Sequence, residues 1–151
     1  MLKIFSILIA SGIIVSCNSN HSAGSHDQQN NSSVPKTRSD SLYKETMAGH
    51  DLGMGKMGEI VRYQKAIIQK TDSLRTSNVK GTDFAPALDS ALQALNEAEQ
   101  GMNDWMQSFD PDKAGNTEVE KVKYYHREKE KIEAVNTSIL NSIETAKKVL
   151  E

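Results

Sequence analysis

The chain has 151 residues and a mass of 16.7 kDa, with 37% hydrophobic, 25% charged and 5% aromatic residues. This length accommodates one modest globular domain and excludes a large multidomain enzyme. The 18 basic and 20 acidic residues give a net charge of −2, without the basic footprint of a nucleic-acid-binding protein or a polybasic membrane patch. We therefore expect no nucleic acid among its partners.

Residues 1–16 have the pattern of an export signal. Lys3 provides the positive charge, and the apolar run at 4–15 is interrupted only by Ser6, Ser11 and Gly12. The run is too short to span a bilayer as a helix. The pattern predicts a signal peptide that is cleaved after residue 16.

The signal ends in Ile14-Val15-Ser16-Cys17, which resembles the lipobox of bacterial lipoproteins. That resemblance implies that Cys17 becomes the first residue of the mature chain and carries the acyl chains that anchor it to a membrane. The alternative is an ordinary secretory signal followed by an incidental cysteine. Because Cys17 is the only cysteine, its lipidation would leave no thiol for a disulfide, a thiolate metal site or catalysis.

Asn, Ser, Gln, His and Gly dominate residues 18–39, a composition too polar to bury a core, so we expect lipidated Cys17 and a disordered tether over residues 17–40. A weak metal-binding role for His21 and His26 in this segment is the less favoured interpretation. The tether has neither an acidic cluster nor an Asp after Cys17. By its resemblance to Gram-negative lipoproteins, we expect the periplasmic face of the outer membrane as the location.

From Ser41 onward, apolar residues recur every three or four positions in three blocks, which predicts helices at about 41–77, 83–109 and 117–150. Asp83 can cap the second helix and Pro86 fits its first turn, while Thr117 and Glu120 have the spacing of a capping box. The charged run at 121–131 is interpreted as solvated helix surface. Short connections make successive helices antiparallel neighbours. The sequence therefore predicts an all-α, up-down-up antiparallel three-helix bundle with long helices over residues 41–151.

Several short motifs in this region are similar to small uncharacterised lipoproteins of Gram-negative bacteria, some of them labelled viral A-type inclusion proteins. The motifs are Met47-Ala48-Gly49-His50-Asp51, Met54, Lys56-Met57-Gly58-Glu59-Ile60, Met102-Asn103-Asp104-Trp105-Met106, Phe109, Lys131-Ile132-Glu133-Ala134-Val135 and Ser142-Ile143-Glu144-Thr145-Ala146. Gly55 departs from the pattern, which has a proline there. The label implies no activity.

If the first two helices form a hairpin that turns at position 80, residues equally far from that position lie side by side. This reflection about position 80 places Met54 beside Met106 and Met57 beside residue 103. All the methionines after residue 17, together with His50 and His126, then lie in one layer near the tether. Thioether and imidazole ligands suit Cu(I), so the candidate metal ligands are His50, Met54, Met57, Met102 and Met106. The favoured alternative is that these methionines fill an irregular core, and a haem with His–Met ligation is a further alternative.

Two other patterns are weak. Asp110-Pro111-Asp112 begins like a calcium loop, but Ala114 and Lys121 occupy ligand positions, so we expect an interhelical turn. His50 and Asp51 resemble a catalytic dyad, but neighbouring helical residues point about 100° apart, so we expect them not to face each other. Without a phosphate loop, nucleophile elbow or HExxH motif, we expect no enzyme.

Taken together, these patterns predict a lipid-anchored, periplasm-facing helical interaction or scaffold protein without catalytic activity or a cofactor. The membrane would be one partner, through Cys17, and a second copy or a helical protein the other. The alternative is a protein that binds or buffers Cu(I) through the Met/His layer.

Overall fold

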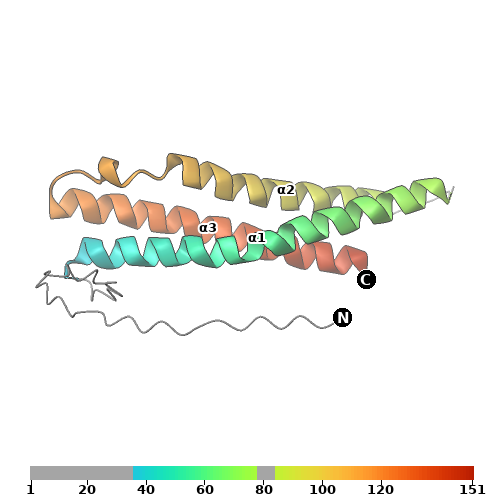
Figure 1. The fold of residues 1–151 in the computed structure, drawn as a ribbon, viewed down its shortest axis with the longest axis horizontal. Helices are drawn as coiled ribbons and strands as arrows, with labels where there is room; N and C mark the ends of the chain where they lie inside the picture. Colours follow the sequence, from blue (N-terminus) through green and yellow to red (C-terminus); the bar gives the residue numbers. More distant parts are fainter. Residues whose placement is uncertain (1–35, 78–83) are drawn as a thin grey trace, which may run out of the picture. The chain divides into compact units, whose positions relative to one another are not determined.

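The computed structural model describes residues 36–77 and 84–151, which contain three long helices. These are α1 (Arg38–Thr76), α2 (Phe84–Ser108) and α3 (Glu118–Leu150), with a short 3-10 helix, η1 (Pro111–Ala114), between α2 and α3. Helices α1 and α3 run in the same direction and α2 runs against them (Figure 1). The described residues contain no strand, so the predicted all-α three-helix bundle is confirmed.

Helix α1 begins three residues before the predicted Ser41. Thr37 is its N-cap: the Thr37 side chain accepts a hydrogen bond from the Asp40 N–H, and the Asp40 side chain accepts one from the Thr37 N–H. This is a capping box with Asp in place of Glu or Gln, which is why the sequence pattern missed it. The predicted tether over residues 17–40 is therefore too long at its C-terminal end. Cys17 and the predicted signal peptide lie outside the described residues.

The other helix ends follow the sequence more closely. Thr117 caps α3 through the predicted capping box with Glu120, and Pro86 lies in the first turn of α2. Asp83, the predicted cap of α2, lies outside the described residues. Before α3, Asp110 caps η1, and Gly115 has φ +87°, a left-handed conformation that favours glycine. The segment that begins like a calcium loop is thus an interhelical turn.

The core is a line of buried residues, most of them apolar, along the centre of the bundle. On α1 it passes through Leu42, Thr46, Gly53, Ile60 and Ile67, all of them buried. The facing residues of α2 and α3 are Leu88, Ala91, Leu95, Ala98, Met102, Trp105, Ile132, Ile139, Ile143 and Ala146. No helix in the described part of the chain is long and apolar enough to cross a membrane.

Two glycines allow α1 to approach α3 closely. A Cβ added at Gly49 would lie 2.9 Å from Ile132 Cγ2, and one added at Gly53 would overlap Met102 Cε and Asn136 Oδ1. The Asn136 side chain also donates a hydrogen bond to the Gly49 carbonyl oxygen at 2.8 Å. Only glycine fits at these two positions without displacing a neighbour.

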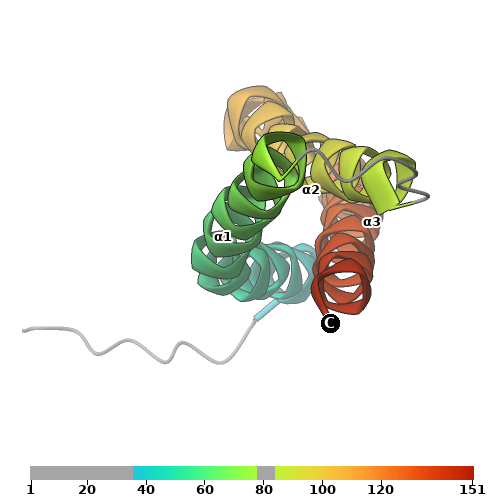
Figure 2. The same cartoon turned by 90° about the vertical axis from the view of Figure 1, so that its right-hand side faces the viewer.

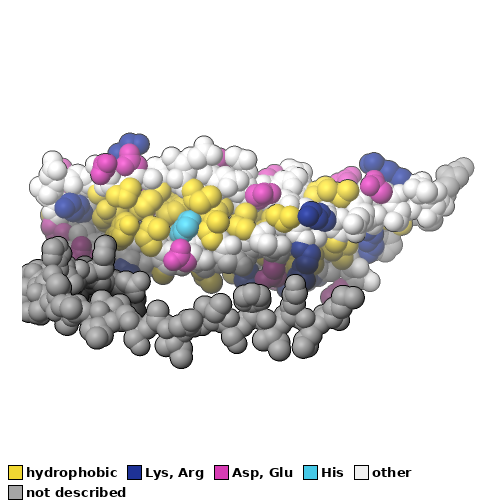
Figure 3. Space-filling model, in the orientation of Figure 1, with side chains coloured by type: hydrophobic (Ala, Val, Ile, Leu, Met, Phe, Trp, Pro, Cys, Tyr) yellow, Lys and Arg dark blue, Asp and Glu magenta, His cyan; other side chains and the backbone are white. Residues whose placement is uncertain are grey.

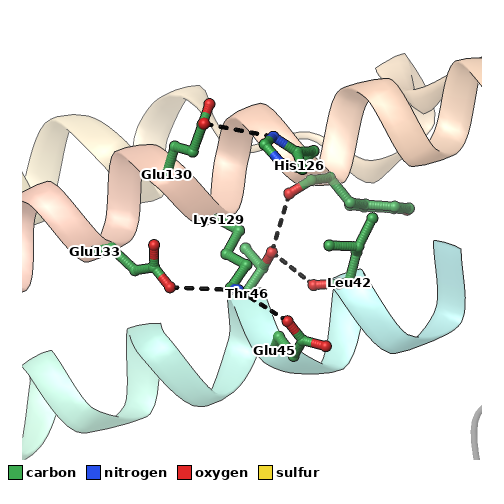
Figure 4. A network of polar contacts seen from close by, with 8 residues as sticks. Leu42, Glu45, Thr46, His126, Lys129, Glu130 and Glu133 are labelled. Carbon is green, nitrogen blue, oxygen red and sulfur yellow. Dashed lines mark hydrogen bonds and ion pairs between the residues drawn. The ribbon is translucent and has the colours of Figure 1, made fainter. Parts of the chain in front are cut away.

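A polar network on the surface also links α1 to α3 (Figure 4). Lys129 Nζ lies 2.9 Å from Glu45 Oε2 and 3.5 Å from Glu133 Oε1. The Thr46 hydroxyl, which is buried, donates to the Leu42 carbonyl oxygen at 2.8 Å and also approaches the Tyr125 carbonyl oxygen at 3.4 Å. These contacts fix the register of the two parallel helices.

Helix α1 does not follow one neighbour along its whole length. Its first half runs beside α3, and its second half crosses toward α2 (Figures 1 and 2). In the second half, the Gln64 side chain donates to Asn96 Oδ1 at 3.0 Å and to Glu99 Oε2 at 2.8 Å. Gln64 and Asn96 are each 16 positions from residue 80, so their contact agrees with the predicted reflection about that position. Toward the start of α1, the ribbons of α1 and α2 lie farther apart (Figure 1).

Candidate functional site

The candidate site is the apolar surface where residues 43–61 of α1 meet the second half of α2. Tyr43 and His50 of α1 point toward α2: the Tyr43 ring centroid lies 6.4 Å from that of Phe109, and His50 lies 5.7 Å from Trp105. Residues three or four positions apart share a helix face, so Met47, Met54, Met57 and Val61 belong to the same stripe. We call this set, Tyr43, Met47, His50, Met54, Met57, Val61, Trp105, Met106 and Phe109, the α1–α2 groove.

Much of the groove surface is apolar and exposed. Met54, Val61 and Met106 are 40%, 38% and 37% exposed. Met47, Met57 and Phe109 are half-buried, and Trp105 is buried beneath them. In the space-filling view, a continuous apolar area lies between α1 and α2 in this half of the bundle, with a histidine within it (Figure 3). A contiguous area of this kind typically marks an interaction surface, whereas scattered apolar residues do not.

Aromatic rings from all three helices form the end of the groove. Trp105 and Phe109 stack with centroids 4.7 Å apart, and Tyr125 packs edge-on against Tyr43 at 5.3 Å and against Tyr124 at 5.3 Å. Burial raises the pKa of the Tyr125 hydroxyl above its usual value of 10.0. The sequence reasoning missed this cluster. The available signal was that these aromatics occur at the start of α1, the end of α2 and the start of α3, which meet in an up-down-up bundle.

The predicted metal ligands have different environments in the structure. Met102 is fully buried against Gly53, Met57 packs on the core, and Met54 and Met106 are exposed in the groove. His50 lies beside Trp105, with the two ring centroids 5.7 Å apart. The five residues thus come from one half of the bundle, although only part of the set reaches a common surface.

His50 differs from its prediction in one respect. Its Nδ1 atom lies 3.0 Å from Asp51 Oδ1, so the expectation that these neighbouring side chains do not face each other is wrong. The His50 and Asp51 side chains reach each other at the surface of α1, where Asp51 is 78% exposed. The contact orients the imidazole against Trp105.

Two expectations for α3 are also wrong. His126 is not part of the Met/His layer, because its side chain is 58% exposed and lies 3.5 Å from Glu130. The charged run at 121–131 is not entirely solvated, because Glu128 is only 4% exposed and pairs with Lys131 at 2.7 Å. Position 128 lies two turns before Asn136 and one turn before Ile132, so it falls on the core-facing side of α3.

Three buried side-chain polar atoms have no hydrogen-bond partner among the described residues. They are Trp105 Nε1, Glu128 Oε2 and Asn136 Oδ1. Within the described ranges, no group of three or more His, Cys, Asp or Glu residues could hold a metal ion.

Comparison with known proteins gives no assignment. The chain matches no known protein family, no curated protein and no solved structure. The groove is therefore interpreted from its own chemistry.

Proposed function

We propose that this protein is a lipid-anchored docking protein whose α1–α2 groove receives the apolar face of an amphipathic helix. The observation that carries the proposal is the mainly apolar, partly exposed lining of the groove, from Tyr43 through Met54 to Val61, opposite Met106 and Phe109. The α1 part of this lining is roughly 27 Å long at about 1.5 Å per residue, which is the length of about five helical turns. Helix-in-groove recognition uses apolar anchors at this spacing.

The composition of the groove favours binding over catalysis. Methionine side chains are flexible and polarisable, so a surface lined by Met47, Met54 and Met106 can adapt to different apolar side chains. The stacked rings of Trp105 and Phe109 provide a rigid base beside them. A surface of this kind has no requirement for a nucleophile, and we propose a scaffold role without chemistry.

The proposed anchor is Cys17, on the periplasmic face of the outer membrane. As a flexible coil, the segment from Cys17 to the Thr37 cap would place the start of α1 roughly 25 Å from the membrane surface. Cells labelled with an alkyne fatty acid test this part of the proposal. Label is expected in the wild-type protein and not in Cys17→Ala, whereas equal labelling of the two, or labelling of neither, would contradict it.

The groove itself is tested by recovery of a partner after crosslinking in cells. The double variant Met54→Asp/Met106→Asp places two carboxylates in the groove, and it is expected to lose a partner that the wild type retains. Leu140→Asp is the matched control, because Leu140 is a similarly exposed apolar residue of α3 that lies outside the groove. Equal recovery with all three proteins would contradict a docking role for the groove.

Cu(I) binding is a second candidate, favoured by the position of His50 in the same groove as Met54 and Met57. Imidazole and thioether groups are suitable ligands for this ion. Cu(I) binding predicts retention of the ion against a chromogenic chelator, quenching of Trp105 fluorescence, and loss of both effects in Met54→Leu, which preserves volume. Removal of copper from the protein as readily as from buffer would exclude it.

A further inference from the structure

The outer face of α1, which contacts neither α2 nor α3, is a row of exposed residues with two glycines at its centre. Eight exposed residues follow one another there at alternating spacings of four and three, the spacing of a coiled-coil seam. They are Lys44, Ala48, Asp51, Gly55, Gly58, Arg62, Lys65 and Gln69. We call this set the α1 seam.

The two glycines at the centre of the seam are not required by the fold of one chain. A Cβ at Gly55 or Gly58 would have no atom within 4 Å, whereas one at Gly49 or Gly53 would meet α3. Glycine disfavours a helix interior relative to alanine, so the bare surface at Gly55 and Gly58 weakens α1 without improving its packing. A second helix packed against Gly55 and Gly58 would explain both glycines, because without side chains there the two helix backbones could approach closely.

We propose that the occupant is a second copy of this chain, with the two α1 helices antiparallel and a two-fold axis between Gly55 and Gly58. In this arrangement Gly55 faces the partner's Gly58, Asp51 faces the partner's Arg62, and Ala48 faces the partner's Lys65. The two-fold axis repeats each contact, so the dimer has two reciprocal ion pairs. Two-fold association through one self-complementary surface is the commonest form of homodimer.

The charges favour this arrangement over the other alignments of two α1 helices. Asp51 and Arg62 are equally far from the centre of the seam, and their side chains are 78% and 65% exposed. Each has a surface contact within the chain, Asp51 with His50 at 3.0 Å and Arg62 with the Tyr63 hydroxyl at 3.2 Å, and the partner's charge would add to these contacts or replace them. A parallel pair would place Asp51 against the partner's Asp51 and Arg62 against the partner's Arg62, which is repulsive. Shifting the antiparallel pair by one heptad in either direction would place Asp51 opposite an uncharged residue, Gly55 or Gln69.

Apolar contacts would flank the seam on one side. Met54 and Val61 are exposed on the same side of α1, and the antiparallel arrangement brings Met54 of one copy near the partner's Val61. Both residues also lie at the edge of the α1–α2 groove. The rest of the groove, including Trp105, Met106 and Phe109 of α2, is not part of this contact, so the proposed dimer does not depend on the docking of a helix.

The test is a charge exchange measured by sedimentation equilibrium on residues 33–151, which form one compact unit containing the whole bundle. The wild type is expected to dimerise, and Asp51→Arg and Arg62→Asp are each expected to weaken the dimer by at least about tenfold. An equimolar mixture of the two variants is expected to form a heterodimer again, because the two introduced side chains have opposite charges and face each other across the seam. Asp104→Arg, an exposed change on α2, is the control and is expected to dimerise like the wild type.

Three results would overturn the proposal. The first is a wild-type protein that remains monomeric up to about 1 mM, the dissociation constant of a very weak contact. The second is a dimer that both single variants form as well as the wild type does. The third is a dimer that each variant disrupts but that mixing does not restore, which would exclude this register. Unchanged circular dichroism of the single variants verifies that loss of the dimer is not loss of the fold.

Discussion

Ser39 donates two hydrogen bonds to the carboxylate of Glu118, one from its backbone N–H to Oε1 at 2.9 Å and one from its hydroxyl to Oε2 at 2.7 Å. The pair joins the first turn of α1 to the first turn of α3, although the residues are 79 positions apart. Ser39 lies in the segment that its composition assigned to the tether. The contact therefore marks the point at which the bundle begins.

These two hydrogen bonds lower the pKa of Glu118 below its ordinary value of 4.5, with the Ser39 hydroxyl as the larger cause and the Ser39 N–H as the second. Because the folded-state pKa is the lower one, the contact stabilises the fold fully above the ordinary pKa of 4.5. Its contribution is lost as the pH falls through the folded-state pKa. Glu118→Gln is therefore expected to melt at a lower temperature than the wild type at neutral pH, and the difference is expected to shrink in acid.

Thermal melting at a series of pH values between about 7 and 3 measures this effect. Glu144→Gln is the control, because Glu144 also has a lowered pKa, caused mainly by a hydrogen bond from Lys148, but that pair lies within one helix. A constant difference between wild type and Glu118→Gln across the whole range would contradict the assignment.

Gly53→Ala and Gly58→Ala are expected to change stability in opposite directions. Alanine at position 53 would overlap Met102 and Asn136, which is expected to cost about 1–3 kcal/mol of the free energy of unfolding despite the better helix propensity. Alanine at position 58 meets open space in one chain and is expected to stabilise α1 by up to about 1 kcal/mol. Chemical denaturation at a concentration low enough to keep the protein monomeric compares the two. Stabilisation by both variants would show that α1 does not approach α3 as closely as described.

Two adjacent isoleucines provide a matched test of the core. Ile67 is fully buried and Ile68 is 47% exposed. Ile67→Ala is expected to cost about 2–5 kcal/mol, because it leaves a cavity between the helices, whereas Ile68→Ala is expected to cost under about 1 kcal/mol. Equal losses of unfolding free energy in urea would contradict the burial of Ile67 and the exposure of Ile68, and would mean that α1 is rotated about its axis.

The helix pattern was predictable because strong apolar periodicity and capping signals agree. In α2, the near-heptad run from Leu88 to Trp105 became the buried face, and Thr117 with Glu120 fixed the start of α3. These signals are local, so they require no knowledge of the neighbouring helices.

The apolar residues that recur every three or four positions in α1 do not form one buried face. Among them, Ile60 and Ile67 are buried, whereas the adjacent Val61 and Ile68 are exposed. The actual core line of α1 also includes Thr46 and Gly53, which hydrophobicity does not identify. Their burial depends on what α3 places opposite them, and that information is not contained in the periodicity of α1.

The groove was predictable only in part. Reflection of the chain brought the methionines and His50 to one half of the bundle, but it assumed straight helices in contact along their full length. Since the first half of α1 follows α3 instead, Met54 and Met106 are exposed rather than packed in a core. The reflection also placed His126 in this layer, although that side chain points to solvent.

Site-specific photo-crosslinking in cells tests the docking role of the groove most directly. A photoreactive side chain at Met106 of the full-length protein is expected to form one discrete adduct, and mass spectrometry is expected to place the attachment on the apolar face of an amphipathic helix. The same group at Leu140 of α3 is expected to give no such adduct. Identical products from Met106 and Leu140, or no product from Met106, would contradict the proposal that the α1–α2 groove receives a helix.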